Sequence, residues 1–175
     1  MAVEIKQITS KIDLFRFVKF GNNFYKNCEY FCPHLILDDM STFNTKKNPA
    51  FDVCEHILFM AYKDGKAVGR IAGIINHQAN LKWGVKNARF GWMDFIDDLE
   101  VSRALLDAVA AWGKEKGMEG LNGPVGFTDF DLQGLLIEGH DHLVPMASLY
   151  NFPYYEHHMD DYGLVKENDW IEMQI

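Results

Sequence analysis

Residues Arg89–Gly126 have the sequence RFGWMDFIDDLEVSRALLDAVAAWGKEKGMEGLNGPVG, and this stretch decides the fold. Asp97 and Asp98 suit the amino end of a helix in its middle, and Gly117 suits the carboxyl end. Apolar strands are predicted on both sides of the helix. A strand, a crossing helix and a second strand form a βαβ unit with parallel strands, which binds ligands at the carboxyl ends of its strands. The helix is predicted from apolar residues at i, i+3 and i+4 spacing, which form one buried face: Val101, Ala104, Leu105, Ala108, Val109 and Trp112.

The composition restricts the class of protein. The chain has 175 residues, of which 48% are hydrophobic, and a formal net charge of −8. One domain with a filled core is expected. The acidic balance argues against nucleic acid, which needs a basic face, and against an anionic membrane surface. Cys28, Cys32 and Cys54 are an odd number of cysteines in a chain too large to need disulfides, so we expect reduced thiols and a cytoplasmic protein.

The rest of the chain supplies further strands and helices. Asp64–Gly65 between two apolar runs predicts a hairpin of His56–Tyr62 and Ala67–Asn76. Gly69 and Gly73 in its second strand predict a bulge or a close approach of another group. The other expected elements are a strand at Val3–Ile8, a helix from Ser10 to about Asn27, a short helix at Asp38–Asn44, a polar connection at His77–Val85, a short helix near Leu132–Glu138, a helix from Asn151 to Tyr162 and a last strand at Trp170–Ile175.

This order of elements resembles the GNAT (Gcn5-related N-acetyltransferase) superfamily over nearly the whole chain. Three passages carry the resemblance: the hairpin ILFMAYKDGKAVGRIAGIIN, the strand–helix–strand centre, and PYYEHHMDDYGLVKENDWIEM near the end. The centre, the later GLLIEGHD and YNFPYY look like an uncharacterised bacterial GNAT-like group. The resemblance implies an α/β (α+β) fold in one domain over residues 1–175. Its sheet would be mixed and mainly antiparallel, with a central βαβ unit and flanking helices.

The resemblance also implies an activity. GNAT enzymes transfer an acyl group from acetyl-CoA or another acyl-CoA to a small-molecule or amine acceptor. Their pantetheine arm lies between two splayed strands, which correspond here to about Ala88–Phe95 and Leu121–Phe127. The residues expected to contact the cofactor are Trp92, Met93, Phe95, Arg103, Gly123, Val125 and Phe127.

Three residues are candidates for proton transfer. If the protein is an acyltransferase, Asp94 would accept a proton from the acceptor amine. The alternative for Asp94 is a solvated strand-end carboxylate or a helix cap. Tyr154 or Tyr155 would protonate the departing thiolate, as the equivalent helix tyrosine does in many GNAT enzymes. Because adjacent tyrosines point to different faces, the alternative is that one of them is core.

One departure from the GNAT pattern stands before the central helix. GNAT enzymes hold the CoA pyrophosphate there with a glycine-containing loop. The corresponding segment Phe95–Arg103 has no glycine and carries three carboxylates, Asp97, Asp98 and Glu100, of which Arg103 can offset one. Like charges at short range cost about 1 kcal/mol each at solvated sites. The alternative function is therefore a catalytically inactive GNAT-like binding or assembly module.

Glycine, aromatic and histidine residues are further candidates for a ligand site, and each also has a purely structural explanation. Gly120, Gly123 and Gly126 indicate either an edge strand or a strand splayed to admit a ligand. The histidine-containing segments His140–His142 and His157–His158 lack the spacing of a zinc site, so no metal ion is expected. The aromatic residues that either line the cleft or fill the core are Trp83, Trp92, Phe127, Phe130 and Tyr150.

The strand predicted at the carboxyl terminus would leave one edge of the sheet uncovered. GNAT folds finish with one more strand than the one predicted at Trp170–Ile175. An uncovered apolar edge favours association. We expect either a homodimer or pairing with a second GNAT-like half, with this chain as the amino-terminal part of a longer protein.

Overall fold

The computed structural model describes residues 2–144 and 148–171. In that part of the chain the strands form one sheet in the order β1-β2-β3-β4-β5. Neighbours from β1 to β4 are antiparallel, and β4 and β5 are parallel. This confirms the mixed, mainly antiparallel sheet with a central βαβ unit. The strands are β1 (Glu4–Gln7), β2 (Cys54–Lys63), β3 (Lys66–Asn76), β4 (Asn87–Phe95) and β5 (Gly120–Asn122).

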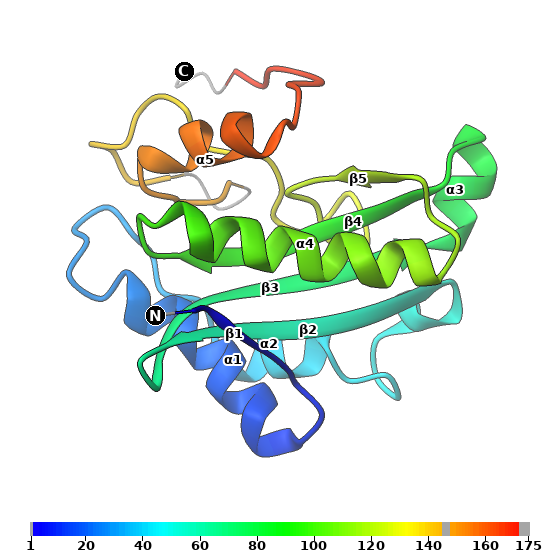
Figure 1. The fold of residues 1–175 in the computed structure, drawn as a ribbon, viewed down its shortest axis with the longest axis horizontal. Helices are drawn as coiled ribbons and strands as arrows, with labels where there is room; N and C mark the ends of the chain where they lie inside the picture. The colour runs from blue at the N-terminus through cyan, green and yellow to red at the C-terminus, as the bar shows by residue number, and fades with distance from the viewer. Residues whose placement is uncertain (1, 145–147, 172–175) are drawn as a thin grey trace.

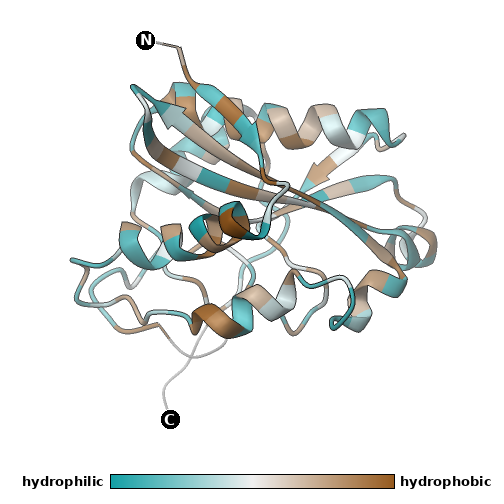
Figure 2. Cartoon of the chain, turned by 90° about the horizontal axis from the view of Figure 1, so that it is seen from below, coloured by the Kyte–Doolittle hydropathy of each residue, from teal (hydrophilic) through white to brown (hydrophobic). Residues whose placement is uncertain are grey.

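Helices cover both faces of this sheet. α4 lies along one face, α1 and α2 lie on the other, and α5 lies beside the amino-terminal half of α4 (Figure 1). Hydrophobic and hydrophilic residues alternate around the long helices, as one buried face requires (Figure 2). The helices are α1 (Lys11–Phe24), α2 (Ile36–Thr42), the 3-10 helix η1 (Pro49–Asp52), α3 (His77–Trp83), α4 (Leu99–Glu115) and α5 (Tyr154–Tyr162).

Three of the expected elements differ from the structure. His77–Trp83, within the predicted connection His77–Val85, form α3, because the Asn76 side chain accepts from the Ala79 N–H and Gly84 ends the helix at φ 66°. The helix predicted near Leu132–Glu138 is absent. The Asn151 side chain binds both the N–H and the C=O of Leu136, which a helix would use itself. No strand follows α5 up to Ile171, and the rest of the strand predicted at Trp170–Ile175 lies outside the described residues.

β3 is buried on both of its faces. Ile71 packs in the cluster that includes α4, and Ala72 packs in the cluster that includes α1. Gly69 lets α4 approach closely, because a Cβ atom there would lie 2.8 Å from Leu105 Cδ1. The close approach predicted for the glycines of this strand is therefore present.

β4 contains a bulge that decides the direction of its last side chains. Its register against β3 shifts between Arg70 and Ala72, and Trp92 in the bulge has φ 43°. One extra residue in a strand exchanges the two faces beyond it. Phe90 packs in the α4 cluster, and without the bulge Asp94 would share its face. With the bulge, Asp94 lies beside its register partner Arg70 on the face covered by α1.

β4 and β5 pair over a short distance and then part. The parallel ladder runs from Asn87↔Gly120 to Arg89↔Asn122, and the Val125 N–H still donates to the Phe90 C=O at 2.8 Å. The fifth strand is therefore shorter than the predicted Leu121–Phe127. The rest of β4, from Gly91 onward, has no β5 partner.

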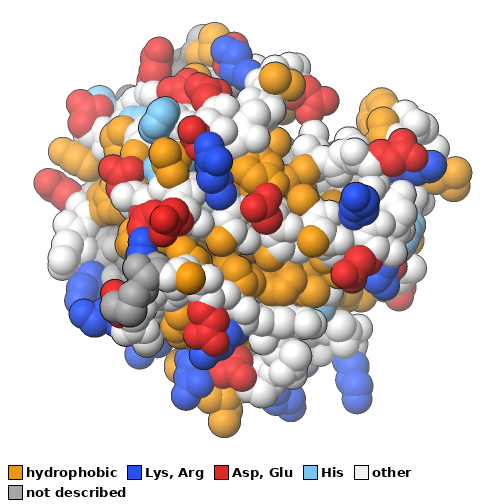
Figure 3. Space-filling view, viewed as in Figure 1, with side chains coloured by type: hydrophobic (Ala, Val, Ile, Leu, Met, Phe, Trp, Pro, Cys, Tyr) orange, Lys and Arg blue, Asp and Glu red, His pale blue; other side chains and the backbone are white. Residues whose placement is uncertain are grey.

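The surface shows no large region of one charge on the side that carries α4. Acidic and basic side chains are interspersed there around hydrophobic ones (Figure 3). Among the described residues, none of the helices has both the length and the hydrophobicity needed to cross a bilayer.

Candidate functional site

A pocket of about 200 Å³ lies where β4 and β5 part. Trp92, Met93 and Asp94 of β4 line one side, and Pro124 lines another. A pocket with an apolar lining and a few polar groups is the usual form of a small-molecule site. Phe130 is fully exposed, so the pocket opens to solvent beside it. The other apolar lining residues include Phe31, Leu132, Leu135, Leu149, Tyr150 and Met159.

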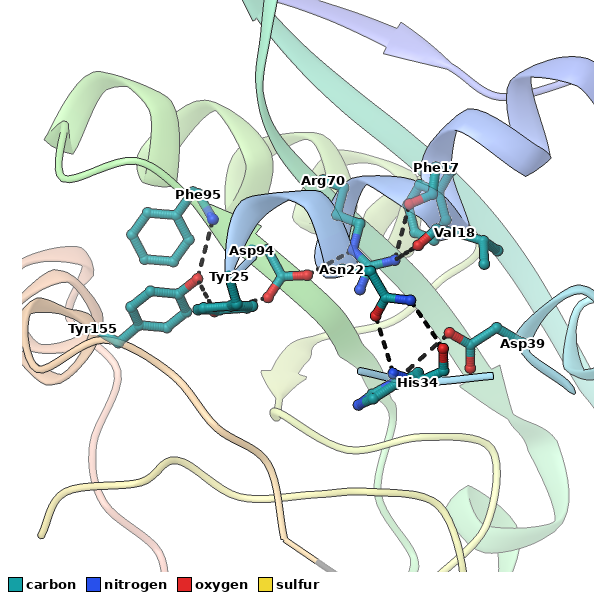
Figure 4. Close-up of polar contacts among 10 residues, drawn as sticks. All are labelled: Phe17, Val18, Asn22, Tyr25, His34, Asp39, Arg70, Asp94, Phe95 and Tyr155. Atoms are coloured by element: carbon teal, nitrogen blue, oxygen red, sulfur yellow. Dashed lines mark hydrogen bonds and ion pairs between the residues drawn. The ribbon is translucent and has the colours of Figure 1, made fainter. Parts of the chain in front are cut away.

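An ion pair between β3 and β4 forms the polar floor of this pocket. Arg70 Nε donates to Asp94 Oδ2 at 2.6 Å, and the two residues are only 4% and 7% exposed. The second arm of the guanidinium, Nη1, donates to the C=O groups of Phe17 and Val18 in α1 at 2.9 and 3.2 Å (Figure 4). Asp94 is thus neither a solvated carboxylate nor a helix cap. The charges of Arg70 and Asp94 compensate each other, as burial of charged groups requires.

Two tyrosines extend this ion pair into a chain of hydrogen bonds. The Tyr25 hydroxyl donates to Asp94 Oδ1 at 2.9 Å and lies 2.8 Å from the Tyr155 hydroxyl. Because the single proton of Tyr25 goes to Asp94, Tyr155 donates to Tyr25. Tyr155 also accepts from the Phe95 N–H at 3.1 Å (Figure 4). The chain of hydrogen bonds therefore runs from Tyr155 in α5 through Tyr25, which directly follows α1, to Asp94 in β4.

Burial sets the protonation of these tyrosines. Loss of contact with water raises the pKa of Tyr25 and of Tyr155 well above 10.0, and the Asp94 charge raises both further. Desolvation disfavours a phenolate, and a nearby carboxylate does the same. Both hydroxyls are therefore neutral proton donors at ordinary pH.

Tyr154 occupies a neighbouring position. Its hydroxyl donates to the Phe95 C=O, so the two α5 tyrosines together satisfy both backbone groups of Phe95. Phe95 stands at the end of β4, beyond the part that pairs with β5. The two tyrosines therefore bind the end of β4 at Phe95. The preceding residues of that strand, Trp92–Asp94, form part of the pocket wall.

A second polar group lines the pocket from α1 and α2. Asn22 binds the backbone of His34 through both side-chain atoms, at 2.9 and 3.0 Å. That clamp fixes His34, whose Nδ1 lies 3.6 Å from Asp39 Oδ2 (Figure 4). Asn22, His34 and Asp39 all line the pocket. This wall therefore offers a second carboxylate and an imidazole to a polar part of a ligand.

The structure places the predicted site residues in two groups. Asp94, Tyr155, Trp92 and Met93 line the pocket, as do the predicted aromatics Phe130 and Tyr150. Tyr154 and Phe95 adjoin the pocket through the α5 contacts just described.

The remaining predicted residues lie elsewhere. Gly123 packs on Phe90, and Val125 lies against Gly91. Phe127 is buried in an aromatic cluster with Phe43, Phe51 and Trp92. Arg103 pairs with Asp161 at 2.8 Å. Trp83 is an exposed residue of α3 outside the pocket lining.

Several polar residues of the pocket were not predicted from the sequence, among them Arg70, Tyr25, His34 and Asp39. Arg70 had a visible signal, because it is the single charged residue within the apolar run AVGRIAGIIN. A charge in a strand buried on both faces needs a partner. Tyr25 lies near the end of the predicted helix, and nothing in the sequence relates it to Asp94. His34 and Asp39 belong to the aromatic, irregular stretch from Cys28 to Phe51.

The histidine segments do not form a metal centre in the described part of the chain. No group of three or more His, Cys, Asp or Glu residues there is arranged to hold a metal ion. His158 instead lies 2.7 Å from the Ser102 hydroxyl and 2.9 Å from Asp97 Oδ1. These bonds join α5 to the amino end of α4, and full burial of Ser102 keeps its hydroxyl away from any substrate.

Two curated proteins resemble this chain in sequence, and no family model matches it. Protein YghO of Escherichia coli (strain K12) is 32% identical over 171 residues, which are 95% of this chain and 43% of YghO. Bacterial ceramide synthase of Caulobacter vibrioides is 29% identical over 137 residues, which are 77% of this chain and 35% of the synthase. The chain thus spans less than half the length of each relative.

Two of the solved structures that share this fold are acetyltransferases by name. A predicted acetyltransferase from Clostridium acetobutylicum, solved with acetyl-CoA, has a TM-score of 0.58 at 11% identity and covers 98% of this chain and 96% of its own. An aminoglycoside acetyltransferase from an uncultured soil sample, in complex with sisomicin, has a TM-score of 0.58 at 12% identity and covers 99% and 95%. At such identities the likeness shows the fold alone, and it confirms the fold that the sequence resemblance predicted.

Proposed function

The chain has the GNAT fold, and we propose on that premise that it is an N-acyltransferase, which moves an acyl group from a thioester to an amine. The observation that carries the proposal is the buried Asp94 carboxylate, which faces the pocket where β4 and β5 part. Its hydrogen-bond chain through Tyr25 to Tyr155 connects that carboxylate to a second proton donor. A base and an acid joined in one pocket are what aminolysis of a thioester needs.

The proposed step balances through this chain. The amine nitrogen attacks the thioester carbonyl carbon, a C–N bond forms and the C–S bond breaks. Asp94 takes the proton that the amine loses. The Tyr155 hydroxyl turns its proton from Tyr25 to the leaving thiolate and releases it there. Tyr25 turns its own proton from Asp94 to Tyr155, and Tyr25 then takes the proton held by Asp94. One proton thus passes from nitrogen to sulfur, and the three side chains return to their starting state.

The donor is proposed as acetyl-CoA or another acyl-CoA. A protein of the same fold was solved with acetyl-CoA, which supports this donor class. The acyl end of the donor would approach Met93 and Asp94 from the side of Pro124, since these residues line the pocket together. Trp92 would border the same acyl group.

The acceptor is proposed as an amine with an apolar body. Asp94 and the Asp39 partner of His34 each bring a carboxylate to the pocket, and carboxylates suit an ammonium group. The wall between them is apolar, with Phe31, Trp92 and Leu132 among its residues. One sequence relative is named a bacterial ceramide synthase, and a ceramide is an N-acylated long-chain amino alcohol. That name supports testing long-chain amines first.

The test is turnover with a panel of acyl-CoA esters of increasing chain length against short-chain and long-chain primary amines. Free thiol release gives the rate, and mass spectrometry identifies the amide. We expect turnover with at least one pair, and a loss of about 100-fold or more in kcat in D94N, which keeps the shape and removes the base. Absence of any amide product would instead support the non-catalytic binding module.

D107N is the matched control for D94N. Asp107 also accepts from a tyrosine hydroxyl, that of Tyr162 at 2.9 Å, but it is exposed and lies outside the pocket lining. D107N should retain the wild-type rate. Equal losses in D94N and D107N would show that the defect does not come from the pocket.

A further inference from the structure

The amino end of α4 already holds an anion from its own chain. Asp98 is the N-cap, and its Oδ1 accepts from the Glu100 N–H at 3.0 Å. The N–H groups of Val101 and Ser102 donate to the Asp98 C=O at 2.9 and 3.2 Å. A helix amino end binds a phosphate through such free N–H groups. Here the N–H groups of Glu100, Val101 and Ser102 are already engaged by Asp98.

The cations near this end are also committed. Lys63 Nζ donates to Asp98 Oδ2 at 2.6 Å and to Glu100 Oε2 at 3.1 Å, so one ammonium serves two carboxylates. The hydrogen bond from Lys63 lowers the pKa of Asp98, which keeps that carboxylate charged. Arg103 points away to Asp161.

The backbone before α4 gives no room for a phosphate either. No glycine occurs from Phe95 to Arg103, so the loop cannot fold its main chain closely around a phosphate. Asp97 in this loop binds His158 and adds a third carboxylate. A diphosphate at this end of α4 would meet three negative side chains with one shared lysine. The residues present do not fit the diphosphate of CoA.

We propose that this protein recognises its acyl donor through the thioester and the pantetheine arm alone, and holds no diphosphate at α4. This inference rests on the proposed acyl transfer and narrows its donor class. The slot beside Met93, Asp94 and Pro124 remains for a thin, amide-bearing arm. Pantetheine thioesters without a nucleotide therefore serve as donors about as well as the CoA esters.

The experiment compares one acyl group on two carriers. The CoA ester that gives the fastest turnover in the chain-length panel is measured against the pantetheine thioester of the same acid, with the same amine. We expect kcat/KM values within about tenfold of each other. A larger loss with the pantetheine thioester overturns the inference and leaves the acyltransferase proposal standing.

Binding measurements separate the two proposals further. Isothermal titration of CoA and of pantetheine should give similar dissociation constants, and CoA binding more than about tenfold tighter overturns the inference even without turnover. If neither molecule binds at millimolar concentration, the inference and the acyltransferase proposal both fail. Amide formation from CoA esters together with tighter CoA binding would remove the inference alone.

A pair of variants tests the residues themselves. E100Q removes one carboxylate from Lys63 and leaves the Asp98 cap in place, so CoA should bind about threefold to fivefold more tightly while pantetheine is unchanged. E119Q is the matched control, because Glu119 is equally exposed and pairs with Lys86 away from this end of α4. Weaker CoA binding in E100Q, or the same gain in E119Q, contradicts the inference.

Discussion

A Cβ atom on Gly21 would lie 2.1 Å from the Arg70 guanidinium, so the α1 glycine and the buried arginine fit only together. The absence of a side chain at Gly21 lets the helix lie directly on the ion pair with Asp94. The position of α1 on the sheet therefore depends on the contact between Gly21 and Arg70.

Gly21→Ala tests this contact. Alanine favours a helix over glycine by about 1 kcal/mol. The collision with the fixed guanidinium should exceed that gain, because overpacking a buried site costs about 1 to 3 kcal/mol. Urea unfolding should show a net loss of stability, and acyl transfer should fall with it. Lys19→Ala, at an exposed position of the same helix, should be close to neutral, and a stabilised Gly21→Ala would contradict the coupling.

Arg70 and Asp94 should behave as a coupled pair in unfolding. Arg70→Met and Asp94→Leu each leave a buried, uncompensated charge, which costs about 3 to 5 kcal/mol. The double variant should be less destabilised than the sum of the two. The pair Arg103 and Asp161 is the control, because its arginine is half exposed and such pairs contribute about 1 kcal/mol or less. Additive losses at Arg70 and Asp94 would show that they do not interact.

The buried tyrosines predict a loss of stability at alkaline pH. The pKa of Tyr25 in the folded chain is raised above its ordinary 10.0, so the folded state holds the proton more tightly than the unfolded state. The stability that this proton provides is complete below about pH 10 and is lost as pH rises towards the raised pKa. The slope is about 1.4 kcal/mol per pH unit for one group.

Tyr25→Phe checks the sign of this effect. The variant cannot ionise at that position, so its unfolding free energy should fall less steeply between about pH 10 and pH 11 than that of the natural chain. The difference between the two slopes should approach the value for one proton, about 1.4 kcal/mol per pH unit. Parallel pH profiles for the two proteins would show that Tyr25 ionises freely in the folded state.

Ser102→Ala should loosen the link between α4 and α5. The change leaves His158 Nδ1 buried without its 2.7 Å partner, and an unsatisfied buried polar group costs about 1 to 3 kcal/mol. Ser41→Ala removes an exposed hydroxyl and serves as the control in the same urea titration. A Ser102→Ala variant as stable as the control would mean that His158 finds another partner.

The sequence by itself determined the elements with strong local patterns. The spacing of Val101, Leu105 and Val109 gave α4, because a helix buries residues at that period. Asp64–Gly65 gave the hairpin, because both residues take the positive φ that its turn requires. The end of α5 was also predictable from the local sequence, since Gly163 ends that helix at φ 91°.

Only the tertiary structure decided the site. Arg70, Asp94 and Tyr155 come from β3, β4 and α5, and Tyr25 directly follows α1. No local pattern relates these four residues. The bulge at Trp92 turns Asp94 to the face of Arg70, and a bulge depends on how two strands pair rather than on either strand alone. Burial on both faces of β3 then forces the two charges together, because an isolated charge in the core is too costly.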